Sequence, residues 1–260
     1  HGSLNVIGAL EKSCNYYFYE TGWRLGLEKL SAYANYFGLG RKTGIELPYE
    51  ASGTLASPQT VEEKHDTAPE STFLSASIGQ SYNDFTPIQV AKYIAMIANR
   101  GKVVNPTLIK NIVTSDGKQV SATEIQDYVN EKLGITAKDT ESLDISDENM
   151  NAVLEGMRGV TDDTGTAAKI FQGFSIAVGG KTGSTEAGVD KDGNDIINAW
   201  FVGFAPFDNP EIAVVGMVEG GGHGYYVAEV VRDIISEYFG MNVQEINEDV
   251  TASSEMEFVR

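Results

Sequence analysis

The chain has 260 residues, 42% of them apolar, and its 37 acidic and 19 basic side chains give a formal net charge of −18 at pH 7. This length allows one large domain or two small ones. So acidic a surface repels nucleic acid and anionic lipid, and we expect neither as a partner. The sequence has no run of about 18 apolar residues and no basic-then-apolar start, so we expect neither a membrane span nor a signal peptide. With Cys14 as its one cysteine, the chain has no internal disulfide.

The first part of the chain has mostly helical patterns. Residues 4–12 and 16–25 predict two helices that are interrupted at Ser13-Cys14-Asn15. A third helix is expected over residues 26–37, because a glycine follows it as a stop signal. Residues 38–85 are rich in Gly, Pro, Ser and Thr, which predicts mostly extended loops.

The middle of the chain begins with a strong helix signal. Thr86-Pro87 provides an N-cap and a proline at the first helical position, and the helix should stop at Gly101. Residues 106–121 predict a hairpin with Asp116-Gly117 as its turn. Residues 122–145 are polar and poorly patterned, so we expect a surface excursion there.

The last part combines helices with a sheet. Ser146 should cap a helix whose apolar residues recur at helical spacing, and three strands are expected at about 174–182, 196–205 and 211–219. Their short connections make them antiparallel neighbours. A final helix, about 226–239, should bury one apolar face against the sheet, formed by Val227, Val230, Val231, Ile234, Ile235 and Tyr238.

This order of elements predicts an α+β fold, with an antiparallel sheet covered by helices. We expect one domain over residues 1–240 and a loose tail over residues 241–260, which carries few apolar residues.

Two short motifs carry chemical information. Lys181-Thr182-Gly183 follows the apolar run 174–180, which predicts a buried strand, and precedes Ser184. A cation, a hydroxyl and a bare backbone at the end of a strand suit the binding of a peptide carboxylate beside a sheet edge. The second motif is the triplet Ser13-Cys14-Asn15 at the break between two predicted helices.

The two triplets resemble the K-T-G and S-D-N-type motifs of serine-acylated penicillin-binding proteins. Further segments resemble the transpeptidase domain of class B penicillin-binding proteins in order and spacing, namely Phe37–Gly40 with Thr43–Pro48, Gly79–Ser81 with Thr86–Gln89, Thr164–Ala167, and Ala199–Pro206. The resemblance covers residues 1 to about 240, the C-terminal two thirds or so of that domain. It implies a β-lactamase/transpeptidase-like fold with a mostly helical subdomain.

The resemblance also implies a role for each motif residue on the strand. Lys181 would supply positive charge for the terminal carboxylate and for a proton relay, and Thr182 would donate a hydrogen bond to that carboxylate. Gly183 would let the substrate backbone add to the sheet edge, because it has no Cβ. The backbone amide of Ser184 would be one donor of the oxyanion hole.

The helical triplet would serve the leaving group and the substrate amide. By the same resemblance, Ser13 would pass a proton toward the leaving amine. Asn15 would bind the substrate amide and steady the lysine of the S-x-x-K motif that carries the nucleophilic serine. The reaction implied is acyl transfer through a covalent acyl-enzyme.

The nucleophile motif itself has no convincing match. The S-x-x-K in the sequence, Ser115-Asp116-Gly117-Lys118, lies at a predicted turn and follows Ser13 instead of preceding it. We therefore expect the nucleophile region to lie upstream of His1, so that this chain alone is inactive. A second K-T-G, Lys42-Thr43-Gly44, is not preceded by a buried strand and is rejected as the active-site motif.

The resemblance implies peptidoglycan stem peptides and β-lactams as ligands and a cell-wall glycosyltransferase as partner. It also implies a location on the extracytoplasmic face of a bacterial membrane, anchored by an upstream segment. Two alternatives stay open: a D,D-carboxypeptidase or β-lactamase with water as acceptor, and a noncatalytic β-lactam-sensing module. No cofactor is expected, although His1 and Cys14 are zinc-ligand types that would need further ligands from outside this sequence.

Overall fold

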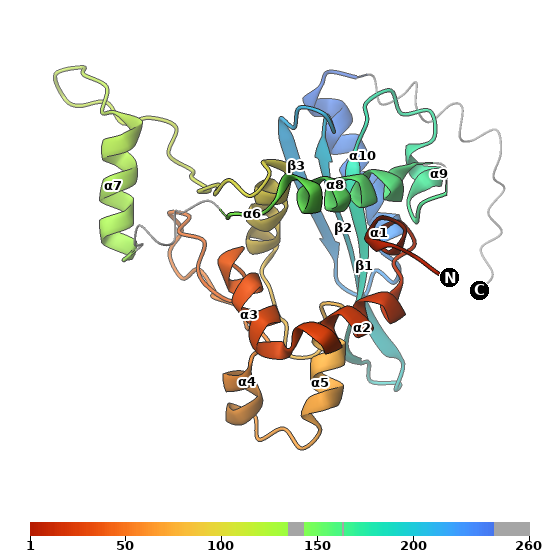
Figure 1. Ribbon diagram of the computed structural model, residues 1–260. Coiled ribbons are helices and arrows are strands. Elements are labelled where there is room, and N and C mark those ends of the chain that lie inside the picture. The colour runs from red at the N-terminus through yellow and green to blue at the C-terminus, as the bar shows by residue number, and fades with distance from the viewer. Residues whose placement is uncertain (135–142, 163, 242–260) are drawn as a thin grey trace. The chain divides into compact units, whose positions relative to one another are not determined.

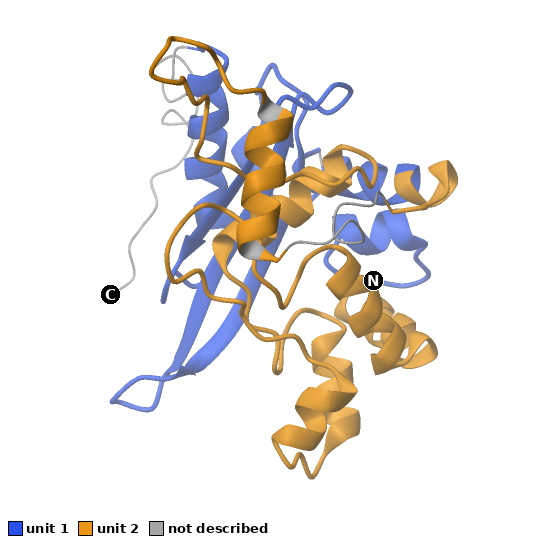
Figure 2. Ribbon diagram, turned by 90° about the vertical axis from the view of Figure 1, so that its left-hand side faces the viewer, with its two compact units in different colours: residues 1–13, 151–260 blue, residues 14–150 orange. Residues whose placement is uncertain are grey.

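The computed structural model describes residues 1–134, 143–162 and 164–241. The chain divides into two compact units (Figure 2): unit 1 comprises His1–Ser13 and Asn151–Arg260, and unit 2 comprises Cys14–Met150. Within the described ranges, no helix combines the length and apolar character needed to cross a membrane. Residues 242–260 of the expected tail lie outside the described residues.

Unit 1 is built on an antiparallel sheet of three strands (Figure 1): β1 (Gly179–Val189), β2 (Asp195–Ala205) and β3 (Ile212–Val218), in the order β1-β2-β3. In this register Lys181 lies opposite Val202. The predicted meander of antiparallel neighbours is confirmed.

The predicted start of the first strand was wrong. Residues 174–178 are not in the sheet, and β1 begins only at Gly179 and continues to Val189. The apolar side chains of the preceding run pack into or against the core, with Val178 only 1% exposed and Phe174 partly buried. The apolar run therefore indicated that these side chains are buried, but not that their backbone pairs with a neighbouring strand. As a result, the K-T-G lies near the start of its strand instead of at the end.

Helix α10 (Tyr225–Tyr238) packs against β2 and β3, as expected for the final helix (Figure 1). The buried stripe of α10 contains Val227, Ala228, Val231 and Ile235, which join Phe201 in the core. The predicted face was too wide, because Val230, Ile234 and Tyr238 are exposed. A helix that lies on a sheet buries only one stripe of its circumference.

The remaining helices of unit 1 place Ser13, the first residue of the Ser13-Cys14-Asn15 motif. Helix α1 (Val6–Glu11) lies against α8 (Asp147–Thr161), whose Gly156 leaves room for it. A Cβ at Gly156 would come within 2.7 Å of Leu10 Cδ1. The chain leaves α1 at its C-cap Lys12, so Ser13 follows a helix end that packs closely on α8. The short helix α9 (Ala168–Phe171) joins the core through Phe171.

Unit 2 is mostly helical, in agreement with the predicted helical subdomain. Its helices are α2 (Asn15–Leu25), α3 (Leu27–Tyr36), α4 (Pro58–Glu63), α5 (Pro69–Ala76), α6 (Pro87–Ala98) and α7 (Ala122–Leu133). Helix α6 begins as predicted, with a complete capping box between Thr86 and Gln89. Together with the sheet of unit 1, this confirms the α+β class.

Three helices of unit 2 were not predicted. The segment 38–85 is mostly without helix or strand, as predicted, but it also contains α4 and α5, and the predicted surface excursion 122–145 contains α7. Two of these helices have polar start signals: Ser57 caps α4 through the amide of Thr60 at 3.1 Å, and Ser121 caps α7 in a capping box with Glu124. These polar start signals are helix signals in their own right, but they lie among turn-forming residues that hide them.

The predicted hairpin at residues 106–121 is shorter than expected, and its outermost backbone hydrogen bond runs from Val120 N to Ile112 O at 2.9 Å. Val113 and Gln119 form an isolated bridge, and Thr114 N donates to Lys118 O at 2.8 Å. The Asp116-Gly117 turn is therefore present, but the flanking residues 106–112 form no named strand.

Candidate active site

Lys181 is the centre of the site. It is the third residue of β1, and its ammonium donates hydrogen bonds to Ser13 Oγ and to Thr182 O, the latter at 2.9 Å. Ser13 reaches it from the end of α1 with a φ of +49°, a backbone region that residues other than glycine adopt rarely. The structure thus brings together two residues that are 168 positions apart in the sequence, one from each motif.

Burial sets the proton affinity of Lys181. Removal from water lowers the pKa of its ammonium from 10.5 to about 8. Desolvation destabilises the charged form of an amine, so the neutral form becomes accessible near neutral pH. Lys181 can therefore carry positive charge toward a ligand and still release or accept a proton through the Ser13 hydroxyl.

This pKa predicts a pH-dependent stability. Below pH 8 the fold must bury a charged ammonium, whereas between pH 8 and 10.5 the folded chain is neutral here and the unfolded chain is protonated. The unfolded state then binds more protons, so the free energy of unfolding should rise with pH across that window. We expect Lys181→Met to stabilise the fold at pH 7 by on the order of a few kcal/mol, with a gap that closes toward pH 10.

Urea denaturation of wild type and variant at both pH values measures this gap. Lys191→Met is the matched control, because Lys191 is exposed in the turn between β1 and β2. A gap of equal size at both pH values would contradict the lowered pKa.

The three residues after Lys181 line the free edge of the sheet. Among the described residues, β1 has a strand partner on one side only, so its other edge is available to an extended peptide. Thr182 Oγ1 lies 3.0 Å from Thr166 Oγ1, and Ser184 Oγ accepts a hydrogen bond from Gly224 N at 3.3 Å. Gly224 packs on the strand so closely that a Cβ there would lie 2.5 Å from Gly183 O.

A polar cluster beside Ser13 was missed from the sequence. Lys12 Nζ donates to Thr164 O at 2.7 Å and pairs with Glu11 Oε1 at 2.9 Å, and Thr164 Oγ1 donates to Glu11 Oε1. The hydrogen bond from Thr164, more than any other contact, lowers the pKa of Glu11. In the sequence, the segment Thr164–Ala167 stood out only for its resemblance to the family, and in the structure it leads into α9.

The other two members of the Ser13-Cys14-Asn15 motif belong to unit 2. Asn15 is the first residue of α2 and is exposed, and Cys14 is the buried N-cap of that helix. The role of Asn15 therefore stays a prediction. In the described ranges, no group of three or more His, Cys, Asp and Glu side chains could hold a metal ion, so a zinc site at His1 and Cys14 gains no further ligand there.

The S-x-x-K at Ser115 and the second K-T-G at Lys42 both have local geometries unsuited to catalysis. Ser115 and Lys118 lie on the exposed turn of unit 2, where the Lys118 side chain is 82% exposed and pairs with Asp116 at 2.9 Å. Thr43 of the second K-T-G donates from its amide and its hydroxyl to Glu50 Oε1, at 2.7 and 2.6 Å. Lys118 is therefore not desolvated, and the side chain of Thr43 stabilises its own loop.

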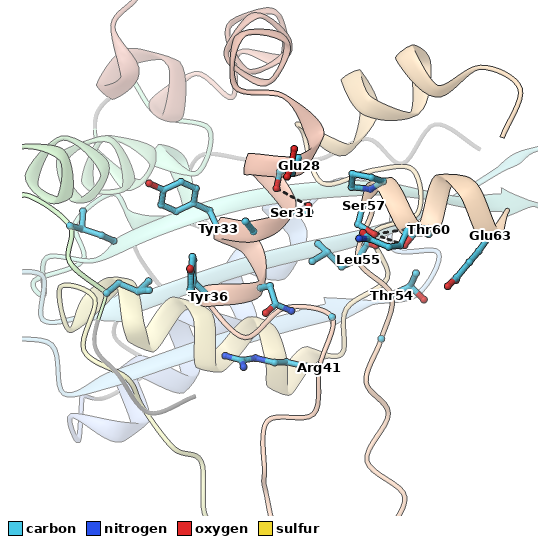
Figure 3. Close-up of a pocket in the computed structure, with 18 of the residues that line it drawn as sticks. Glu28, Ser31, Tyr33, Tyr36, Arg41, Thr54, Leu55, Ser57, Thr60 and Glu63 are labelled. Atoms are coloured by element: carbon cyan, nitrogen blue, oxygen red, sulfur yellow. Dashed lines mark hydrogen bonds between the residues drawn. The ribbon is translucent and has the colours of Figure 1, made fainter. Parts of the chain in front are cut away.

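Unit 2 also contains a wide cavity of about 1220 Å³, shown in Figure 3. Tyr33 and Tyr36 of α3 lie at one side of it, and the start of α4 lies at the other. Hydroxyls on its wall already have local partners: Thr60 Oγ1 donates to Leu55 O at 2.7 Å and lies 3.0 Å from Ser57 Oγ. None of the residues that the sequence singled out for catalysis or binding lines this cavity.

The three-stranded antiparallel sheet and the contact between Lys181 and Ser13 agree with the fold and with the pairing of motifs that the resemblance implies, and comparison with known proteins identifies the family. The family model of the penicillin binding protein transpeptidase domain matches residues 1–236, so the chain belongs to that family. It is 30% identical over 254 residues to the peptidoglycan D,D-transpeptidase MrdA of Escherichia coli K12, covering 90% of this chain and 37% of the relative. It is 32% identical to penicillin-binding protein H of Bacillus subtilis, over 82% of this chain and 30% of that one.

Solved structures agree with this assignment. PBP2 of Pseudomonas aeruginosa, crystallised with WCK 5153, superposes with a TM-score of 0.75 at 30% identity and covers 90% of this chain and 49% of that one. PBP2 of Helicobacter pylori, in complex with MreC, gives a TM-score of 0.72 at 25% identity and covers 92% of this chain and 41% of that one. The chain thus spans well under half the length of the curated relatives it matches.

Proposed function

We propose that this chain is part of a peptidoglycan D,D-transpeptidase that cross-links D-Ala-D-Ala stem peptides through an acyl-enzyme and is acylated by β-lactams. One observation carries the proposal: in a member of the penicillin-binding family, a partly buried lysine on the edge strand β1 is hydrogen bonded to the serine of the Ser-x-Asn motif. That pair can hold a carboxylate and relay a proton, which are the two tasks of acyl transfer from a C-terminal peptide.

The proposed reaction consists of acylation of a serine followed by transfer of the acyl group to an amine. The oxygen of a nucleophilic serine attacks the carbonyl of the penultimate D-Ala, and the serine proton passes through Ser13 to the nitrogen of the terminal D-Ala. The C–N bond then breaks and D-Ala leaves. The amine of a neighbouring stem peptide attacks the resulting ester, forms the new amide and returns the proton to the serine.

We propose that the nucleophilic serine and its lysine belong to an S-x-x-K motif outside this sequence. The local geometry supports this, because Ser115 and Lys118 lie on an exposed turn and Lys118 is already paired with Asp116. A catalytic lysine of this kind must instead face its serine one helical turn away and be shielded from water.

The names of the relatives bear on the alternatives to transpeptidation. Because those relatives are named transpeptidases, we favour an enzyme whose acyl acceptor is an amine over a carboxypeptidase or β-lactamase, whose acceptor is water. For the same reason we favour an enzyme over a noncatalytic sensor. We also propose a place in the cell-wall machinery with a glycosyltransferase partner, outside the cytoplasm and anchored by another segment. Solved relatives include PBP2 with MreC and a peptidoglycan synthase complex, which supports such partners.

Mass spectrometry of the full-length protein tests the proposal. Incubation with benzylpenicillin should give one stoichiometric adduct on a serine, and incubation with a stem pentapeptide and an amine acceptor should give the cross-linked product with loss of D-Ala. Hydrolysis in place of cross-linking would favour the carboxypeptidase alternative. An adduct without any turnover of peptide would favour the sensor.

A further inference from the structure

Thr166 and Thr182 form a pair of hydroxyls beside the motif lysine. Their Oγ1 atoms are 3.0 Å apart, and they come from the loop before α9 and from β1. Each hydroxyl has one proton, so only one of the two protons is used between the oxygens. A carboxylate has two acceptor oxygens, and two neighbouring hydroxyls can both turn their protons toward it.

The backbone holds Thr166 firmly from both sides. A Cβ at Gly165 would collide with the backbone carbonyls at the end of α8, so only a glycine lets the loop approach so closely. On the other side, Ala167 N donates to Val160 O at 2.9 Å. Thr166 itself is exposed between these two fixed neighbours. Its hydroxyl is thus presented from a rigid segment to an open edge of the site.

The same loop is tied to the Ser13 segment. Thr164 accepts from Lys12 through its carbonyl at 2.7 Å and donates to Glu11 through its hydroxyl. Glu11 and Lys12 directly precede Ser13, which contacts Lys181, and Lys181 directly precedes Thr182. A closed ring of contacts therefore fixes Thr166, Thr182, Lys181 and Ser13 relative to one another within unit 1.

We propose that Thr166 is a second carboxylate-binding residue, which acts with Thr182 on the terminal carboxylate of an extended peptide ligand beside β1. The identity of that ligand as a D-Ala-D-Ala peptide rests on the proposed function. Lys181 supplies the charge, whereas the two hydroxyls supply directed donors that a neutral amide end cannot satisfy in the same way. Glu11 and Lys12 act as positioning residues, because they hold Thr164 and thereby the loop.

The test compares an acid with its amide. The full-length protein is titrated with N-acetyl-D-Ala-D-Ala and with its C-terminal amide, and the ratio of the two dissociation constants is measured by NMR. Wild type should prefer the acid, and Thr166→Val should lower that preference about tenfold, because it removes one hydrogen bond to a charged group. Thr166→Ser keeps the hydroxyl and should keep the preference within about twofold. Thr123→Val, at an exposed position on α7, is the matched control.

Each outcome decides the inference. A preference that is unchanged in Thr166→Val, or absent in wild type, would overturn it, and so would an equal loss of affinity for acid and amide, which marks a merely structural threonine. A protein that shows the expected change in preference but forms no adduct with benzylpenicillin would support this inference and contradict the proposed function.

Discussion

Benzylpenicillin is expected to leave the mass of this 260-residue chain unchanged. Acylation needs a serine whose proton is removed by a base one helical turn away and an oxyanion hole next to it. In this chain the S-x-x-K of Ser115 lies on an exposed turn, and its lysine is bound to a carboxylate. Ser13 accepts a hydrogen bond from Lys181, and under the proposed function it relays a proton and is not the nucleophile.

Intact-mass spectrometry after incubation with a molar excess of the drug measures this directly. Co-expression with the part of the full-length protein that we propose to carry S-x-x-K should give a stoichiometric adduct, which would show that the chain is folded and able to complete the site. An adduct on the isolated chain would disprove the missing nucleophile. Peptide mapping, together with Ser13→Ala and Ser115→Ala, would then show which serine reacts.

The sequence predicted those parts of the fold that depend on short-range patterns. The helix at residues 87–98 has its cap, its proline and its apolar stripe within a dozen positions, and the three strands are joined by short turns. Helices α4 and α7 were missed for the opposite reason, since their polar caps lie among turn-forming residues. Tertiary contacts, not local pattern, decide whether such weak helices form.

The sequence predicted only some of the residues of the candidate site. The motifs pointed to Ser13 and Lys181, and the structure places them in contact. Glu11 and Thr164 could not be found in the same way, because they are 153 positions apart and a single hydrogen bond leaves no periodic signal. The lowered pKa of Lys181 was equally hidden, because it comes from burial, which depends on the packed fold.

Replacement of Lys181 by alanine in the full-length protein should have the largest effect of any single change in this chain. We expect the rate of acylation by a fluorescent penicillin to fall by about 10²–10³-fold, the scale of losing one preorganised electrostatic partner in the transition state. The variant removes the donor to Ser13 Oγ and, under the proposed function, the positive charge that binds the ligand carboxylate. The strand itself should persist, since β1 is held by its ladder with β2.

The comparison of Lys181→Ala with Lys181→Arg separates charge from proton transfer. Arginine keeps the positive charge but stays protonated in proteins, so it should preserve binding of the drug better than turnover into the acyl-enzyme.

In wild type, the fraction of neutral Lys181 grows as pH rises toward its pKa of about 8, and an acylation rate that depends on the neutral form should rise with it. The arginine variant should lose that rise. Stopped-flow labelling across this pH range measures both effects, with Lys191→Ala as the control on the same pair of strands. Acylation of Lys181→Ala at the rate of that control would show that Lys181 lies outside the reaction.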